Sequence, residues 1–370
     1  MVYLAILGRQ AKLSVAELES LFSDVTILSP KLALFTSKNE PEINRLGGVI
    51  KLAKEITEEK VEDFLLNTGF DGKFVIGVSD YSKKSNSRKA WSTALRLKKI
   101  LKKSGKSVRI LENKEAILSS ATVFHNQLGE KPGHIEIIKY GNRFFYTFGV
   151  QNINAYAARD RERPARDAKV GMLPPKLAQI LINLCGDLPA GTRILDPFCG
   201  TGVVLQEALL SGYAAYGTDV SSRMVEYTKK NLDWLKERQD LPDYTVTPGD
   251  ATNCVWEQPI EAVACETYLG PPMSNPPAEI KLKEVSQECH AIITGFLKNL
   301  ATQIESGTPV VIAVPAWLRP DGTYFRLKIL DEVDRLGYNV MKYKNLSQED
   351  LLYARAGQVV AREIIHLRKK

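Results

Sequence analysis

The sequence predicts an α/β protein whose carboxy-terminal half forms a doubly wound parallel sheet, and three observations predict it. From about residue 170, short β-prone runs alternate with helical segments. The first of these runs ends at Asp196 and turns through Gly200 and Gly202 into an apolar helix. The next two runs also end on acids, Asp219 and Asp250. In such sheets, ligands bind at the carboxyl ends of the strands, so polar residues at these ends predict a binding site.

The residues before this half predict two smaller modules. Residues 1–60 contain a strand, a helix in SVAELESLF, further strands and a helix containing INRLGGVIKLAKEI. Residues 61–150 contain the strand KFVIGVS, a basic helix, the strand SVRIL and two alternating strands, HIEIIKY and RFFYTFGV. Residues 151–170 are dense in charge and proline, which predicts a linker. Residues 171–370 then form the final domain.

Composition limits the class of protein. A chain of 370 residues with 44% hydrophobic content is long enough for two or more domains, and no apolar run approaches the roughly 20 residues that span a bilayer. The amino terminus has no basic leader, so we expect a cytoplasmic protein without membrane attachment. The odd number of cysteines and the scattered histidines argue against a disulfide framework, a metal site and a catalytic triad.

The basic excess of the chain is concentrated in one segment. Residues 80–115 hold 12 Lys/Arg and 3 Asp/Glu, a local charge of +9, whereas the rest of the chain sums to −2. Within this segment a helical pattern places Ala90, Ala94, Leu97 and Leu101 on one stripe. The opposite arc carries five cations that no acid of the same helix interrupts: Arg88, Lys89, Arg96, Lys99 and Lys103. We therefore expect a face that binds a polyanion such as RNA, although a solvated surface is the simpler alternative.

The acids at the strand ends predict the chemistry of the ligand. Asp219 is placed to accept hydrogen bonds from the hydroxyls of a ribose, and Asp250 from an adenine amino group. Gly200 and Gly202 let the backbone approach the ligand closely. Asp196 would repel a pyrophosphate but suits an ammonium group, so S-adenosylmethionine fits better than a dinucleotide.

Two motifs, DPFCGTG and YGTDVSSRMVE, resemble those of class I amino methyltransferases. The preceding RPARDAKVGMLPPKLAQILINL resembles the junction and first helix of tRNA guanosine 2-amino methyltransferases that carry an amino-terminal THUMP domain. The resemblance implies a Rossmann-like class I methyltransferase domain preceded by a small α+β module and a THUMP-like domain. It also implies S-adenosylmethionine as methyl donor and tRNA as substrate. In the cofactor pocket it adds Pro174, Pro197, Val220 and Ala251 to the acids and glycines.

The catalytic motif departs from the pattern of this family. Relatives have Asp/Asn-Pro-Pro-Tyr/Phe after the fourth strand, whereas this chain has ACETYLGPP. We expect Glu266 to accept from the substrate amine and Tyr268 to stack on the flipped base, with Thr267 in the place of the first proline. A second candidate is Asn275 in SNPP, but Ala278 stands where the aromatic residue belongs.

The sequence favours methylation of the exocyclic amine of a guanosine in tRNA, and the resemblance points to the tenth nucleotide. Two alternatives stay open: a DNA or ribosomal-RNA amino methyltransferase, and a catalytically silent protein that binds S-adenosylmethionine and RNA. The sequence does not indicate the oligomeric state or a protein partner.

Overall fold

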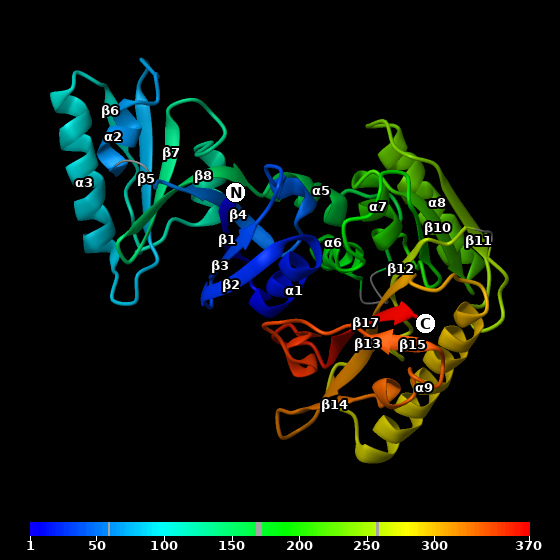
Figure 1. The fold of residues 1–370 in the computed structure, drawn as a ribbon. Helices are drawn as coiled ribbons and strands as arrows, with labels where there is room; N and C mark the ends of the chain where they lie inside the picture. The colour runs from blue at the N-terminus through cyan, green and yellow to red at the C-terminus, as the bar shows by residue number, and fades with distance from the viewer. Residues whose placement is uncertain (58–59, 168–171, 257–258) are drawn as a thin grey trace. The chain divides into compact units, whose positions relative to one another are not determined.

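The computed structural model describes residues 1–57, 60–167, 172–256 and 259–370. These residues form two compact units, each with its own sheet (Figure 1). Unit 1 comprises Met1–Ala11 and Phe22–Ala155, and unit 2 comprises Lys12–Leu21 and Tyr156–Lys370. The boundary expected at residue 60 falls within unit 1, and the expected linker contains the helix α5 (Ile153–Arg161). The finer division into four parts stays a prediction.

Unit 1 is built on a mixed sheet with the strand order β2-β3-β1-β4-β8-β7-β5-β6. Strand β5 is parallel to β6 and β7, and the other neighbouring pairs are antiparallel. The strands are β1 (Val2–Leu7), β2 (Ser23–Ser29), β3 (Leu32–Thr36), β4 (Val49–Glu55), β5 (Phe74–Asp80), β6 (Val108–Ile110), β7 (His134–Tyr140) and β8 (Arg143–Val150). The two modules expected in residues 1–150 therefore share one sheet.

The prediction of a helix over INRLGGVIKLAKEI is wrong. Only Ile43–Arg45 is helical, as the 3-10 turn η1, and Val49–Glu55 is the strand β4. The spacing of the apolar residues fits a helix, but β4 pairs with β1 on one side and with β8 on the other. Hydrogen bonding to two neighbouring strands outweighs the weak local preference.

The helices of unit 1 are α2 (Val61–Leu66), α3 (Ser87–Lys103) and α4 (Ser120–His125). Helices α2 and α3 lie beside the β5–β6 end of the sheet (Figure 1). The predicted apolar stripe of α3 is confirmed, because Ala90, Ala94, Leu97 and Leu101 are its buried residues. They pack against Phe74, Ile76 and Val78 of β5 and leave the opposite face of α3 in solvent.

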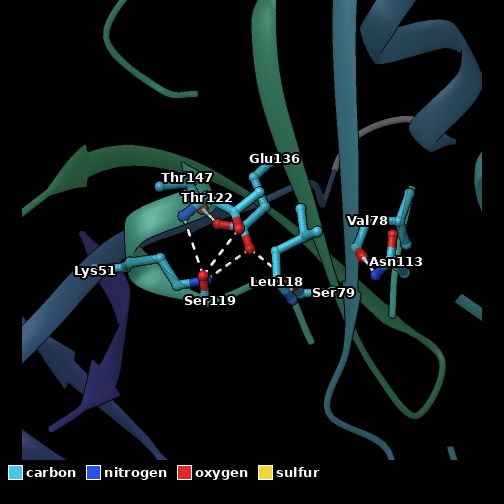
Figure 2. A network of polar contacts seen from close by, with 9 residues as sticks. All are labelled: Lys51, Val78, Ser79, Asn113, Leu118, Ser119, Thr122, Glu136 and Thr147. Atoms are coloured by element: carbon cyan, nitrogen blue, oxygen red, sulfur yellow. Dashed lines mark hydrogen bonds and ion pairs between the residues drawn. The ribbon is translucent and has the colours of Figure 1, made fainter. Parts of the chain in front are cut away.

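A buried ion pair lies at the centre of the unit 1 sheet. Lys51 Nζ of β4 contacts Glu136 Oε1 of β7 at 2.6 Å, and both side chains are almost fully buried. Figure 2 shows Lys51, Ser79 and Thr147 turned toward the Glu136 carboxylate. The Ser79 hydroxyl donates to Oε1 at 2.5 Å and the Thr147 hydroxyl to Oε2 at 2.7 Å. The charges of this pair are thus compensated inside the sheet.

Unit 2 contains the sheet predicted for the carboxy-terminal half. Its strand order is β11-β10-β9-β12-β13-β17-β15, with β14 paired to β13 and β16 to β17. The first five strands of this order are mutually parallel. The strands are β9 (Arg193–Asp196), β10 (Ala214–Asp219), β11 (Tyr244–Pro248), β12 (Ala262–Glu266), β13 (Pro309–Leu318), β14 (Tyr324–Arg326), β15 (Tyr338–Val340), β16 (Leu352–Tyr353) and β17 (Val360–Lys369).

Helices cover both faces of this sheet, so the doubly wound prediction is confirmed. Ala262 and Ala264 of β12 pack with α6 and α7, whereas Val263 and Cys265, on the other face, pack with α9. Helix α1 packs on the α6 side within unit 2. The helices and 3-10 turns are α1 (Ala11–Leu21), α6 (Pro175–Leu184), α7 (Val203–Leu210), α8 (Ser222–Lys236), α9 (Glu279–Ala301), η2 (Ile329–Asp331) and η3 (Gln348–Asp350).

The alternation of strands and helices ends at β13, earlier than the sequence predicts. Strand β17 returns antiparallel to β13 along nine residue pairs, and β15 adds to its other edge. This return places β17 beside β13, whose other neighbour, β12, ends in the predicted catalytic motif. Within the described ranges, no helix is long and apolar enough to cross a membrane.

Candidate active site

The glycine-rich turn joins β9 to α7. Gly200 has a φ of +52° and Gly202 a φ of +82°, values that side chains with a Cβ rarely adopt. A Cβ at Gly202 would also lie 2.8 Å from Thr228 Cγ2 of α8. The Thr228 hydroxyl donates to Gly200 O at 2.8 Å and fixes the turn on this helix. The turn thus presents bare backbone beside Asp196, the last residue of β9.

Two acids flank this turn. Asp196 is only 2% exposed, and its Oδ1 accepts from Phe198 N at 3.1 Å. Asp219 accepts from Gly200 N and from Ser221 N, both at 2.9 Å. Burial raises the pKa of Asp196 well above its usual value, and the charges of Asp219 and Glu266 raise that pKa further. A cation at this place would relieve the repulsion between the three carboxylates.

The loop after β11 is held by α9. Asp250 is exposed, and its Oδ1 accepts from the Thr252 amide and hydroxyl at 2.9 and 2.8 Å. Asn299 Nδ2 donates to Ala251 O at 3.0 Å and to Cys254 O at 2.8 Å. Asp250 is therefore partly engaged within its own loop, and its Oδ2 lies 3.5 Å from Asn253 Nδ2.

The remaining predicted pocket residues lie next to the ends of β9, β10 and α6. Pro197 follows Asp196 and is buried, whereas Val220 follows Asp219 and is 78% exposed. Pro174 is the N-cap of α6, and its carbonyl accepts from Leu177 N at 2.9 Å. The expected roles of these residues in cofactor binding stay predictions.

One residue that the sequence analysis missed joins the segment before α6 to the glycine turn. Asn231 of α8 is fully buried. Its Nδ2 donates to Ala165 O at 2.8 Å and to Thr201 O at 2.9 Å, and its Oδ1 accepts from Ala165 N at 2.9 Å. A buried asparagine in an amphipathic helix was the signal that could have identified it.

Glu266, the expected catalytic acceptor, ends β12. Its side chain is 16% exposed, and its Oε1 accepts from Arg362 Nε of β17 at 2.7 Å. Burial raises the pKa of Glu266, and the guanidinium of Arg362 opposes that rise. Arg362 was missed in the sequence analysis, although a charged pair inside the apolar run VVAREIIHL is an unusual feature of a strand.

The residues after Glu266 explain how the chain departs from the Pro-Pro pattern. Both the amide and the hydroxyl of Thr267 donate to Ala313 O, at 3.0 and 3.1 Å. A proline at this position has no N–H and could not make the first of these bonds. Tyr268 follows and is 36% exposed, whereas the alternative Asn275 lies exposed in the loop before α9. The geometry favours Glu266 over Asn275, because Glu266 lies near the other acids.

Comparison with known proteins agrees with this arrangement. Residues 163–240 match the UPF0020 family, described as an RMKL-like methyltransferase domain. The matched segment lies within unit 2. Over the whole chain the fold is similar to that of TrmN from Thermus thermophilus, with a TM-score of 0.50, 16% identity and full coverage of both chains.

The chain is also similar in sequence to two curated proteins. It is 32% identical over 148 residues to the tRNA (guanine(10)-N2)-dimethyltransferase of Methanothermobacter thermautotrophicus, covering 40% of each chain. It is 36% identical over 129 residues to the protein of the same name from Pyrococcus abyssi, covering 34% of this chain and 37% of the relative. The aligned regions thus span about two fifths of these relatives. Sequence relationship to the tRNA guanine-N2 methyltransferases agrees with the expected family.

The basic face of α3 differs from the prediction at one residue. All five predicted cations are exposed, but Arg96 forms an ion pair with Glu62 of α2. Because Glu62 lies on another helix, the spacing of charges along α3 does not reveal this partner. Lys89 donates to Lys84 O at 2.8 Å. Lys99 and Lys103 are exposed cations in the second half of the helix, and RNA binding by this face stays a prediction.

The cysteines and potential metal ligands give no further site in the part of the chain that the structure describes. The five cysteines are free thiols, and Cys254 is the partly exposed one. Burial raises the pKa of Cys265, and the neighbouring charges of Asp196 and Glu266 raise it further. Among the described residues, no group of three or more His, Cys, Asp or Glu is arranged to hold a metal ion.

Proposed function

We propose that this methyltransferase uses S-adenosylmethionine to methylate the exocyclic 2-amino group of a guanosine in tRNA. The observation that carries the proposal is the position of Glu266. It ends the strand next to β9, and its charge acts on the buried Asp196. Asp196 could thus bind a cationic cofactor, and the neighbouring Glu266 could accept a hydrogen bond from the substrate amine in the same site.

The residues of unit 2 fit S-adenosylmethionine. Asp196 would hold the ammonium group, because a buried carboxylate near two other acids favours a cation. Asp219 would accept from the ribose hydroxyls, since each of its oxygens has a remaining lone pair beyond the backbone amide that it binds. Asp250 Oδ2 would accept from the adenine amino group. The positive φ of Gly200 and Gly202 keeps Cβ atoms away from the ligand.

When bound, the cofactor supplies a methyl group on a positively charged sulfur, so that the N–C bond forms as the C–S bond breaks and one proton leaves the amine. Glu266 would accept the amine hydrogen through Oε2 and remove that proton. Oε2 receives no hydrogen bond from the residues that the structure describes, since Arg362 binds Oε1. Tyr268 is sufficiently exposed to stack on the base.

We propose that unit 1 is the THUMP-like RNA-binding part of the enzyme. Its basic helix would bind phosphate groups, and the pocket of unit 2 would select the base. With these separate roles, α3 does not need to contact any base. The relatives named for guanine(10) support the tenth nucleotide of tRNA as the target.

The proposal is tested by incubating the purified chain with unmodified tRNA and methyl-labelled S-adenosylmethionine. After digestion, we expect the label in N2-methylguanosine or N2,N2-dimethylguanosine. Glu266→Gln should reduce turnover on the order of a hundredfold, since it removes the charge that stabilises the developing cationic amine. Asn275→Ala is the matched control and should retain activity. Label in another nucleoside, or loss of activity in Asn275→Ala but not in Glu266→Gln, would contradict the assignment.

A catalytically silent protein is the second candidate, because the carboxylate of Glu266 is engaged by Arg362. Such a protein would bind both S-adenosylmethionine and tRNA but transfer no methyl group to any RNA or DNA offered. The same assay, combined with calorimetry of cofactor binding, separates this candidate from the enzyme.

A further inference from the structure

We propose that Arg362 is a positioning residue that holds Glu266 in its ionised form with Oε2 directed toward the substrate amine. This inference rests on the proposed function, since it gives Glu266 a part in methyl transfer. It assigns a role to the last strand of unit 2, which lies outside the matched family region at residues 163–240.

The register of three strands places the two side chains on one face of the sheet. Glu266 of β12 lies beside Ala313 of β13, and Arg362 of β17 lies opposite Pro315. Because side chains alternate along a strand, residues 313 and 315 share a face. Ala313 is small, so the guanidinium can reach across β13 to the carboxylate. The result is the 2.7 Å contact between Arg362 Nε and Glu266 Oε1.

Neighbouring contacts fix both ends of this pair. Thr267, the residue after Glu266, is bound twice to Ala313 O, which holds the end of β12 against β13. Gln358 Oε1 lies 3.5 Å from Arg362 Nη1. Arg362 is 5% exposed, so its guanidinium has little freedom to leave the pair. One oxygen of Glu266 is therefore occupied, and the other is left for a substrate.

The electrostatic surroundings show why a cation is needed at this place. Asp196 of β9 lies near enough for its pKa to be raised by the charge of Glu266, and the thiol of Cys265 adjoins both acids. Tyr268 follows in the chain, and the charge of Glu288 on α9 acts on its hydroxyl rather than on Glu266. Arg362 is the group whose charge lowers the pKa of Glu266 against the effect of burial. Without Arg362, Glu266 would take up a proton more readily and lose its capacity to accept one.

A purely structural role is the competing explanation, because an ion pair can also fasten β17 to the sheet. The chain offers a matched control in the next residue of the same strand. Glu363 faces the opposite side and pairs with Arg326 of β14 at 3.1 Å. Arg326→Gln therefore breaks a comparable Arg–Glu pair on β17 without touching Glu266.

The first experiment measures the pH dependence of kcat/KM for tRNA at saturating S-adenosylmethionine. In Arg362→Gln we expect the acid limb to move to higher pH by about one unit or more, since an opposite charge at this distance shifts a carboxyl pKa by about 1–3 units. The affinity for S-adenosylmethionine should stay within about threefold of wild type. Arg362→Lys keeps the charge, so its acid limb should lie close to that of wild type. Arg326→Gln should not shift the acid limb. Superimposable profiles for wild type and Arg362→Gln would overturn the proposal.

The second experiment needs no activity and so separates this inference from the proposed function. Carbon-13 NMR of protein labelled at the glutamate side-chain carboxyl would follow the titration of Glu266, assigned by its loss in Glu266→Gln. We expect a higher midpoint in Arg362→Gln than in wild type or Arg326→Gln. If Arg362→Gln does not fold, Arg362→Met, which keeps an unbranched side chain but no charge, takes its place, and its midpoint should likewise lie above that of wild type. Equal midpoints refute the role of Arg362 even in an active enzyme, whereas an inactive wild type with shifted midpoints refutes only the proposed function.

Discussion

Asn231 Nδ2 donates to Thr201 O at 2.9 Å, and the same side chain binds both backbone groups of Ala165. One buried residue of α8 thus connects the glycine turn to the start of the segment that matches the methyltransferase family. Asp167, two residues after Ala165, adds an ion pair to Arg223 of α8 at 3.0 Å. The segment before α6 is in this way tied to the helix that also supports Gly200 through Thr228.

Asn231→Ala should therefore weaken the binding of S-adenosylmethionine, although Asn231 is not expected to touch it. We expect about a tenfold increase in Kd, or about 1.4 kcal/mol, measured by calorimetry. Asn183→Ala is the matched control, because Asn183 is also a buried asparagine of unit 2 but donates to Glu17 of α1. Both variants should lose stability. Equal cofactor affinities in the two variants would show that the Asn231 connection does not support the site.

Asp196→Asn should stabilise the ligand-free protein while it weakens cofactor binding. The pKa of Asp196 in the folded protein is raised above its unfolded value, so ionisation of this side chain lowers the free energy of unfolding. This loss of stability is absent below about pH 4 and grows as pH rises through the folded pKa. An asparagine retains the acceptor for Phe198 N and removes this cost. We expect a higher Tm for Asp196→Asn than for wild type at pH 8, and a difference that shrinks toward pH 4.

The same pKa predicts how cofactor binding depends on pH. A cation binds the ionised form of Asp196, so affinity for S-adenosylmethionine should fall as pH decreases through the folded pKa. In Asp196→Asn the dependence should be weaker, and the affinity at pH 8 should be lower by one to two decades, as for a lost bond to a charged group worth roughly 1.5–3 kcal/mol. Calorimetry across this range is the measurement. An Asn variant that binds as tightly as wild type would remove Asp196 from the cofactor site.

Tyr268→Ala should raise the apparent KM for tRNA with little effect on cofactor affinity. Stacking of an aromatic ring on a base is worth about 1–3 kcal/mol, and Tyr268 is exposed enough to offer its ring. Tyr268→Phe is the control, since it retains the ring and should behave nearly as wild type. Steady-state kinetics distinguishes the two, and a phenylalanine variant as impaired as the alanine variant would assign the effect to the hydroxyl instead.

The basic face of α3 should bind tRNA in part through Lys99 and Lys103. Changing both to Gln should flatten the slope of log affinity against log salt by about 1.4 to 1.8 units if both contact phosphate. Adding Arg96→Gln should have a smaller further effect, because Arg96 is paired with Glu62. The double change Lys229→Gln and Lys230→Gln on the exposed side of α8 removes the same charge from unit 2. Parallel salt plots for wild type and the α3 variant would identify this face as an ordinary solvated surface.

Removing one partner of the buried ion pair of unit 1 should strongly lower the free energy of unfolding. Lys51→Met leaves Glu136 without its cation inside the sheet, and such a change costs about 3–5 kcal/mol. Lys54→Met on the same strand removes a partly exposed pair with Glu40 and should cost about 0–1 kcal/mol. Denaturant unfolding measures both. Similar losses in the two variants would contradict the importance of burial.

Local patterns in the sequence were sufficient to predict the parallel strands of unit 2 and the glycine turn. Strands β9, β10 and β12 end at the acids Asp196, Asp219 and Glu266, and the apolar stripe of α3 follows from spacing alone. Strand β4 could not be predicted in this way, because its partners β1 and β8 lie far apart in the chain. For the same reason the sequence did not reveal that Arg362 meets Glu266, 96 residues away, or that Glu62 neutralises Arg96. Contacts of this kind are set by tertiary packing and leave little trace in spacing or propensity.

The central claim, that this chain methylates a guanosine amine in tRNA, is tested most directly by mass mapping of the modified nucleosides in tRNA from cells with and without its gene. The account predicts that N2-methylated guanosine at the tenth position is present with the gene and absent without it. Restoring the gene should return the modification, and restoring the Glu266→Gln form should not. An unchanged pattern of guanosine methylation in tRNA, or full restoration by Glu266→Gln, would contradict the account.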